Sequence, residues 1–266
     1  ADGLVIPLGL MPIKDGALVQ YGHDIRYYYD RDHDGKAEGY ETILTGFGVQ
    51  DSHLFPHQFT RAPGGWIYLA QGLFNKSTVR RPDGKPFASG EKEIKFDFCK
   101  LARMRLDGSD FELQAAGPNN VWGFVQARDG EMFLQEANDW GIPVAEFVNG
   151  TNYRSGIKQL LRPYAPEMPP TLPGNQMGGT GLCGLALVED KDSPFQMGYE
   201  GKVFYLVNPI TNRLQIVTAQ VDDEGDYVYK KEKDFLLSDD KWFRPVAAHF
   251  GPDGCLYVSD WYNPII

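Results

Sequence analysis

The sequence has little of several features that mark particular classes of protein. It contains three cysteines in 266 residues and no C-x-x-C pair, which excludes a zinc ribbon or a c-type haem site in this segment. No apolar run approaches the roughly 18 residues of a membrane-spanning helix. Basic residues are outnumbered, 26 against 36 acidic ones, and the net charge of −10 argues against nucleic acid or an anionic membrane as a partner.

The two ends of the chain also lack familiar signals. Residues 1–5 carry no basic stretch of the kind that opens a signal peptide, and residues 262–266 form an apolar, strand-like end. We interpret the chain, residues 1–266, as one domain that is a fragment of a longer protein. Cys99, Cys183 and Cys255 are expected to be buried free thiols, although one disulfide is compatible with secretion.

Helical periodicity is weak, and short β-rich runs bounded by turn residues dominate instead. One pattern, a turn with glycine followed by an aromatic-aliphatic strand, occurs four times, at Gly65, Gly130, Gly201 and Gly254. A unit of short strands that repeats every 50–70 residues or so predicts an all-β fold, a β-propeller with decorated blades. The alternative is a β-sandwich with coincidental Asp-Gly turns.

An acidic loop at residues 30–41 has the spacing of a calcium-binding loop. Carboxylates occupy loop positions 1, 3, 5, 9 and 12, and a glycine occupies position 6. We predict that calcium binds Asp30, Asp32, Asp34 and Glu41 within a β-hairpin and stabilises a blade. The alternative is a solvated acidic turn.

Candidate chemical groups precede several of the predicted strands. His53 and His57 precede the first glycine-strand unit, and either imidazole is suited to general-base chemistry or to a hydrogen bond within the loop. Arg244 precedes the last unit and is suited to holding a carboxylate or pairing with an acidic neighbour. Asn75-Lys76-Ser77 matches the N-glycosylation pattern.

Together these residues resemble a known family, the propeller of membrane-bound dehydrogenases that are secreted by bacteria and often carry a C-terminal c-type haem domain. That propeller is similar to those of the quinoprotein glucose and sorbosone dehydrogenases. The resemblance rests on the acidic loop after Tyr28, Gly46-Phe47-Gly48, His53, the Gly-Gly-Trp-Ile-Tyr strand, Arg244-Pro245-Val246 and the stretch 251–263. It implies a six-bladed propeller in the full protein, a periplasmic or extracellular location, calcium, and PQQ as a cofactor with a carbohydrate as substrate.

The resemblance also implies roles for individual residues. His53 matches the base that takes the sugar hydroxyl proton. The family's Gly-x-Arg-Asn-x-x-Gly motif, which binds quinone and substrate, corresponds to residues 117–123, with Asn120 retained and Asn119 in place of the arginine. Arg244 corresponds to one of two arginines that hold the quinone carboxylates. The resemblance thus implies His53, Asn120 and Arg244 as catalytic residues, and Asn119, Asn120 and Arg244 as cofactor-binding residues; the alternative is a non-catalytic carbohydrate- or partner-binding propeller.

Overall fold

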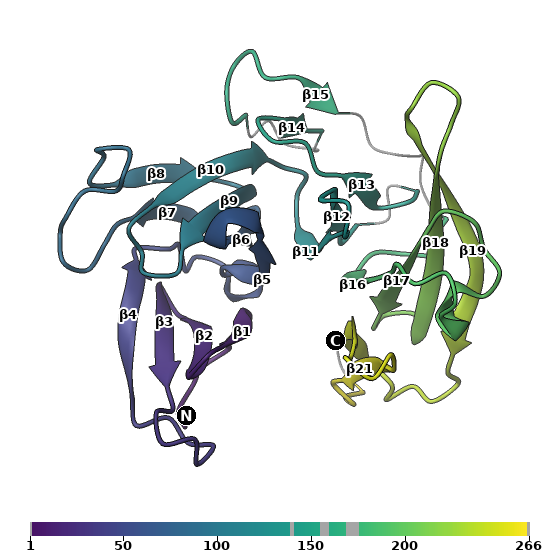
Figure 1. The fold of residues 1–266 in the computed structure, drawn as a ribbon, viewed down its shortest axis with the longest axis horizontal. Helices are drawn as coiled ribbons and strands as arrows, with labels where there is room; N and C mark the ends of the chain where they lie inside the picture. The colour runs from purple at the N-terminus through teal and green to yellow at the C-terminus, as the bar shows by residue number, and fades with distance from the viewer. Residues whose placement is uncertain (1, 139–140, 155–159, 169–175, 265–266) are drawn as a thin grey trace. The chain divides into compact units, whose positions relative to one another are not determined.

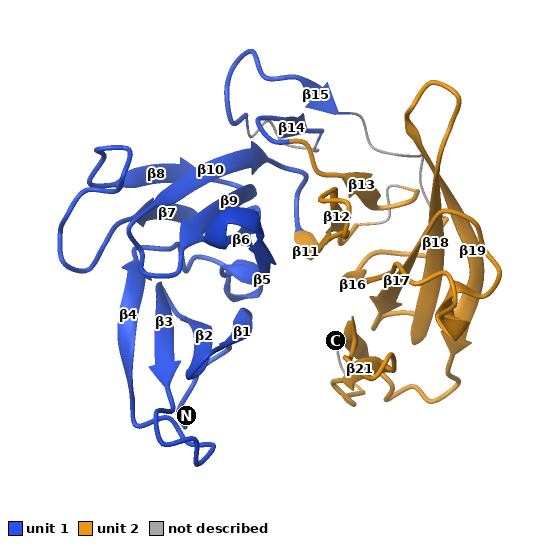
Figure 2. Cartoon of the chain, viewed as in Figure 1, with its two compact units in different colours: residues 1–120, 149–168 blue, residues 121–148, 169–266 orange. Residues whose placement is uncertain are grey.

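The computed structural model describes residues 2–138, 141–154, 160–168 and 176–264. The described residues form β-strands joined by turns and three short 3-10 helices, η1 (Ser52–Leu54), η2 (Pro63–Gly65) and η3 (Pro194–Gln196) (Figure 1). They divide into two compact units, residues 1–120 with 149–168, and residues 121–148 with 169–266 (Figure 2). None of these described helices is long and apolar enough to cross a membrane.

The first unit contains two main antiparallel sheets. The first is a meander of β1 (Leu10–Ile13), β2 (Gly16–Tyr21), β3 (Asp24–Tyr29) and β4 (Gly39–Thr45). The second contains β5 (His57–Ala62), β6 (Trp66–Gln71), β9 (Lys100–Arg105) and β10 (Phe111–Ala116), which β14 (Asn152–Tyr153) and β15 (Glu167–Met168) extend in parallel. A separate hairpin of β7 (Lys76–Val79) and β8 (Ile94–Asp97) lies between β6 and β9 in the chain.

The second unit contains three antiparallel sheets. They are β11 (Val121–Gln126), β12 (Met132–Glu136) and β13 (Val144–Glu146); β16 (Cys183–Val188), β17 (Lys202–Asn208), β18 (Arg213–Val221) and β19 (Tyr227–Leu237); and the pair β20 (Pro245–Phe250) and β21 (Leu256–Asp260). Antiparallel meanders of this kind are the sheets from which propeller blades are built. The predicted all-β class with blade-like sheets is confirmed.

Each predicted glycine-strand unit occupies the same place in its sheet. The strands that follow Gly65, Gly130, Gly201 and Gly254 are β6, β12, β17 and β21, and each is the second strand along the chain of a different sheet. All four glycines have positive φ, which is the conformation that the turn requires. The sheet β1–β4 contains a fifth unit that sequence analysis missed, in which Gly16 follows Asp15 and opens β2.

Aromatic side chains form the core of each unit. In the first unit the fully buried Phe111 packs against Phe47, Phe87 and Phe96, with ring centroids 5.9–6.2 Å apart. In the second unit Phe133 packs edge-on against Phe204 at 5.0 Å. Burial of large rings contributes about 3–5 kcal/mol each by the cost of truncation to alanine, so these clusters supply much of the stability of the sheets.

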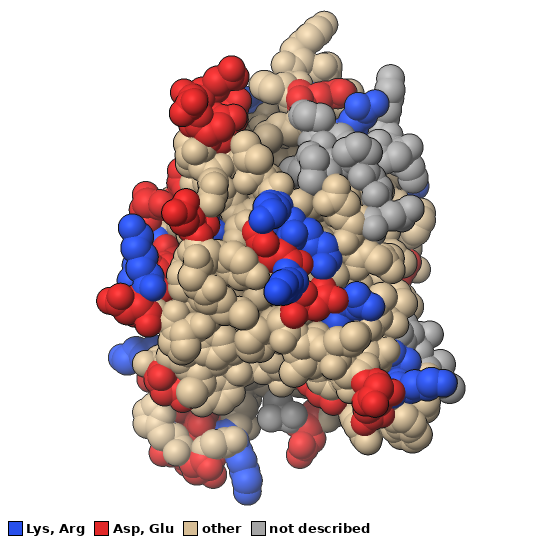
Figure 3. Space-filling view, turned by 90° about the vertical axis from the view of Figure 1, so that its right-hand side faces the viewer, with Lys and Arg blue, Asp and Glu red and all other residues tan. Residues whose placement is uncertain are grey.

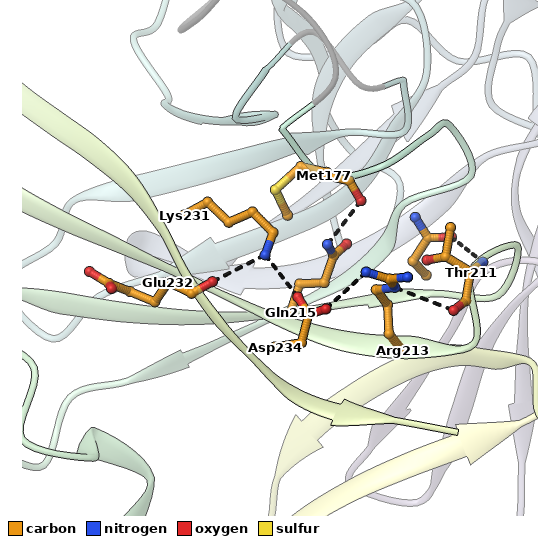
Figure 4. Close-up of polar contacts among 8 residues, drawn as sticks. Met177, Thr211, Arg213, Gln215, Lys231, Glu232 and Asp234 are labelled. Carbon is orange, nitrogen blue, oxygen red and sulfur yellow. Dashed lines mark hydrogen bonds and ion pairs between the residues drawn. The ribbon is translucent and has the colours of Figure 1, made fainter. Parts of the chain in front are cut away.

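The outermost strand of the second unit carries charges of both signs. On the face that Figure 3 shows, basic and acidic side chains are interspersed. The Asp234 carboxylate on β19 accepts a hydrogen bond from the Arg213 guanidinium on β18 at 2.9 Å (Figure 4). It also lies 2.8 Å from the Lys231 ammonium, which donates a further hydrogen bond to the Glu232 carbonyl. Beneath this network the buried Gln215 donates to the Met177 carbonyl at 2.9 Å.

Candidate functional site

The residues proposed for chemistry lie at one topological position, directly before the first strand of a sheet. His53 lies in η1 before β5, Asn119 and Asn120 directly precede β11, and Arg244 directly precedes β20. This position is at the opposite end of each sheet from its glycine turn. The structure therefore places these residues at equivalent points of three separate sheets.

His53 is an exposed imidazole held beside a carboxylate. Its side chain is 89 % exposed, and Nδ1 lies 3.2 Å from Oδ1 of Asp51. The same oxygen accepts the backbone N–H of His53 at 3.0 Å and so caps the short helix. Because Asp51 faces Nδ1, it favours the tautomer with the proton on that nitrogen and leaves the Nε2 lone pair toward solvent.

Asn75 holds the turn that carries this pair, a role that the glycosylation pattern in the sequence does not indicate. Asn75 is fully buried, and its Nδ2 donates to the carbonyls of Asp51 at 3.1 Å and of Leu54 at 2.7 Å. Its Oδ1 accepts the backbone N–H of Asp51 at 2.9 Å. Both ends of the amide are thus engaged in the interior, which is incompatible with glycosylation of the folded chain at this residue.

His57, the other histidine considered as a base, is fully buried in β5. Its Nδ1 lies against the Phe55 carbonyl. A ring with no exposed surface cannot meet a substrate from solvent, so His53 is the better-placed of the two imidazoles.

The motif at residues 117–123 has packing reasons for both of its glycines. Gly117 has a φ of 77°, and a Cβ there would lie 2.5 Å from the Tyr153 carbonyl oxygen. A Cβ on Gly123 would lie 2.6 Å from the Cβ of Leu185. The two glycines are therefore explained by close backbone approach alone, while Asn119 and Asn120 are half-buried at the entry to β11.

Arg244 has a well-defined structural role. Its Nε donates to the Asn263 carbonyl at 3.1 Å, and its Nη1 donates to the Pro209 carbonyl at 2.8 Å. Its backbone N–H donates to Oδ1 of Asp260 at 2.7 Å. The guanidinium thus joins the segment after β21 to the loop after β17.

The acidic loop gathers three carboxylates, and they differ in part from the predicted set. Oxygens of Asp30, Asp32 and Glu38 lie within 4.8 Å of one another. The Glu38 carboxylate accepts hydrogen bonds from the backbone N–H groups of Arg31 and Asp32. Its pKa is lowered first by its own backbone N–H and then by these two hydrogen bonds. Oδ1 of Asp30 is buried and has no hydrogen-bond partner among the described residues.

The other two predicted calcium ligands make different contacts. Oδ1 of Asp34 accepts the backbone N–H of Lys36 at 2.7 Å. Glu41 lies in β4 opposite Tyr27 and has an oxygen 3.8 Å from Nη2 of Arg31. Neither belongs to the group of three. Asp34 binds the backbone of Lys36 within the loop, and Glu41 lies beyond the loop, in the sheet.

The three cysteines form no disulfide with one another, in agreement with the expected thiols. Cys99 is fully buried, Cys183 is half-buried and Cys255 is exposed, so the expectation of burial is wrong for Cys255. Desolvation raises the pKa of the Cys183 thiol to about 12, which keeps it protonated and unreactive at neutral pH.

A family model described as a domain of unknown function, DUF7133, matches residues 1–266. The chain belongs to this family. No curated protein matches the sequence.

Solved structures with a related arrangement are similar to this DUF7133 chain at low identity. One is an oxidoreductase from Thermus thermophilus described as a glucose dehydrogenase, at 17 % identity and a TM-score of 0.49, covering 97 % of this chain and 91 % of that one. Another is the PQQ-bound form of the aldose sugar dehydrogenase from Streptomyces coelicolor, at 14 % identity and a TM-score of 0.47, covering 98 % and 90 %.

Proposed function

We propose that this protein is a carbohydrate dehydrogenase of the quinoprotein type in which His53 accepts a proton from a sugar hydroxyl. The observation that carries the proposal is the exposed His53 imidazole beside Asp51, at the entry to the first strand of a sheet. A general base needs an accessible lone pair and a neighbour that fixes its tautomer, and the His53–Asp51 pair supplies both.

The chemistry assigned to the chain's own residues is a single proton transfer. Nε2 of His53 would take the hydroxyl proton, while the C–H hydrogen with its electron pair would pass as a hydride to a separate two-electron acceptor. Asp51 would hold the ring in place through Nδ1. Asn75 keeps the turn in place, since it bonds to the backbone on both sides of His53. Asn120 is proposed to orient the substrate from the entry to β11.

The residues proposed to hold PQQ do not fit that cofactor well. PQQ, when bound, supplies the two-electron acceptor, and its three carboxylates call for charge-assisted contacts. Asn119 is neutral, and Nε and Nη1 of Arg244 donate to backbone carbonyls. We therefore assign no step to the quinone.

This mismatch favours a second candidate function, a non-catalytic propeller that binds a carbohydrate or another partner. In that case His53 and Asp51 would bind hydroxyl groups without turnover. A c-type haem domain as a covalent partner and a periplasmic or extracellular location belong to the first candidate, and both are proposals.

Calcium is proposed as a structural ion held by Asp30, Asp32 and Glu38. The sequence spacing also implies Asp34 and Glu41 as ligands, but their side chains lie outside this group. Three carboxylate oxygens within 4.8 Å repel one another unless a cation lies among them. The unsatisfied Oδ1 of Asp30 has the chemistry of a hard-cation ligand.

The test is reduction of an artificial electron acceptor by the purified chain with PQQ, calcium and a panel of aldoses. The dehydrogenase candidate predicts turnover in this assay, and it predicts that His53→Gln lowers kcat by about a hundredfold or more, the usual contribution of a general base. The control is His23→Gln, since that side chain is also exposed and next to an aspartate. Sugar binding without PQQ-dependent turnover would select the non-catalytic candidate, and equal activity of both variants would remove His53 from the mechanism.

A further inference from the structure

An open cavity of about 970 Å³ lies within the second unit, at the end of its sheets opposite the N-terminal ends of β11 and β20. It is bounded by the β11–β12 turn, the connection between β16 and β17, and the β18–β19 turn. These are the glycine-turn ends of the sheets. The volume is at the upper end of the range of small-molecule sites, about 300–1,000 Å³.

Two of the three basic residues that line the cavity lie beside carboxylates. Lys202, whose side chain is 18 % exposed, has its ammonium 2.6 Å from Asp129 and 3.2 Å from Glu131. Nε of Arg128 lies 3.8 Å from Glu189. The described lining contains three basic residues, Arg128, Lys191 and Lys202, and three acidic ones, Asp129, Glu189 and Glu200.

This balance excludes several ligand classes. An anion such as a phosphate requires cations that are not already neutralised, and Lys202 has two carboxylates within salt-bridge distance. A free cation would have to compete with the Lys202 ammonium for the same two carboxylates. An apolar ligand would bury these ion pairs away from water, at a cost of several kcal/mol.

The remaining class is a neutral ligand with many hydroxyl groups. Hydroxyls both donate and accept, so they can bind carboxylate oxygens and ammonium hydrogens of the same ion pair. Tyr199 and Tyr227 add aromatic surface for C–H groups. The Tyr227 hydroxyl donates to Glu131, and burial raises its pKa, so it stays a neutral donor.

We infer that this cavity is a binding site for a neutral saccharide, separate from the His53 site. It is formed by Asp129, Lys202, Tyr199 and Tyr227 at the glycine-turn ends of the sheets. The inference does not depend on whether the protein is a dehydrogenase.

The test is isothermal titration calorimetry of the full chain with maltose, with D-glucuronate and D-glucosamine as charged probes. Maltose should bind, and the charged sugars should bind more weakly. Lys202→Gln should weaken maltose binding at least about tenfold, because a hydrogen bond to a charged group is lost. Gln220→Trp, at an exposed lining position, should also weaken maltose binding, because the larger side chain fills the cavity without altering the ion pairs.

Two control variants make the result specific. Lys230→Gln removes an exposed lysine that pairs with Glu232 outside the lining, and it should leave the affinity unchanged. His53→Ala should remove only heat that comes from the His53 site and leave the Lys202-dependent binding in place. No heat from maltose with the wild type, tighter binding of glucuronate, or binding that His53→Ala abolishes while Gln220→Trp retains it would overturn the inference.

Discussion

Asn75 and Asp51 exchange two hydrogen bonds, although 24 residues separate them. The backbone N–H of Asp51 donates to Asn75 Oδ1 at 2.9 Å, and Asn75 Nδ2 donates back to the Asp51 carbonyl at 3.1 Å. The loop after β6 therefore fixes the turn before β5. Asn75 is therefore a positioning residue: it holds the turn that carries His53 and would not itself contact a substrate.

We predict that Asn75→Ala lowers stability by about 1–3 kcal/mol, because two buried carbonyls and one N–H lose their partner. If His53 is the base, kcat should fall more than KM rises, since the base is displaced while binding contacts remain. Urea denaturation and steady-state kinetics measure the two effects. Phe74→Ala, at an exposed neighbouring residue, is the control, and unchanged stability in Asn75→Ala would contradict the assigned bonds.

Arg244→Lys should destabilise the chain by about 1–3 kcal/mol, because a lysine cannot bridge both the Asn263 and Pro209 carbonyls as the guanidinium does. Chemical denaturation measures the change, with the exposed Arg80→Lys as the matched control. A variant with full stability but weaker PQQ binding would instead support the cofactor role that the sequence implies.

Calcium should raise the melting temperature of the chain, because an ion bound only by the folded state stabilises it by mass action. At about a hundred times the Kd the gain is about 2.7 kcal/mol. Asp30→Asn and Glu38→Gln should abolish this shift, whereas Glu41→Gln should retain most of it, because Glu41 lies in β4. Scanning calorimetry with calcium and with EDTA decides this, and Asp223→Asn is the exposed control. Identical curves with and without calcium would refute the site.

Gly16→Ala should be far more destabilising than Gly130→Ala, although both glycines begin a repeat unit. A Cβ at residue 16 would lie 2.0 Å from the Tyr28 carbonyl oxygen, whereas none of the atoms around residue 130 lies within 4 Å of the corresponding position. Both residues have positive φ, 149° at Gly16 and 94° at Gly130, so an alanine is strained at either position, and only at Gly16 does a clash add to that strain. Thermal denaturation of the two variants measures the difference, and equal losses would argue against the close packing of β2 on β3.

Glu146→Gln should stabilise the chain at neutral pH. Burial, with Glu131 and Asp226 nearby, raises the pKa of Glu146 above its usual 4.5, so the folded state holds this proton more tightly than the unfolded state. Its ionisation therefore costs stability as pH rises from about 4.5 through the raised pKa. The melting-temperature difference between variant and wild type should grow over that interval and then level off. Glu91→Gln, at an exposed position, should show no such trend.

The sequence predicted the repeated unit because its turn and strand are local. A glycine turn followed by a short run of aromatic and aliphatic residues can be recognised without knowing which strands pair. Gly16 escaped notice because the strand after it, Gly16–Tyr21, lacks the early aromatic residue of the other copies.

The sequence did not reveal contacts that depend on where strands begin and on how loops fold back onto distant parts of the chain. Asn75 meets Asp51 only because the loop after β6 folds back on the turn before β5. Glu38 replaces Glu41 beside Asp30 because β4 begins at Gly39 and carries Glu41 away with it. The cavity around Lys202 depends on three turns that are remote in the chain, and no short motif encodes it.

The charges on β19 have a consequence for how the protein behaves at high concentration. This eleven-residue strand lies at the edge of its sheet and exposes Val228, Leu236 and Leu237. An edge of that length would offer an open template for another chain, but Lys230, Lys231 and Lys233 interrupt it. Acetylation of these lysines would remove the charges that interrupt this edge, and the strand would become a better template for intermolecular β-sheet pairing.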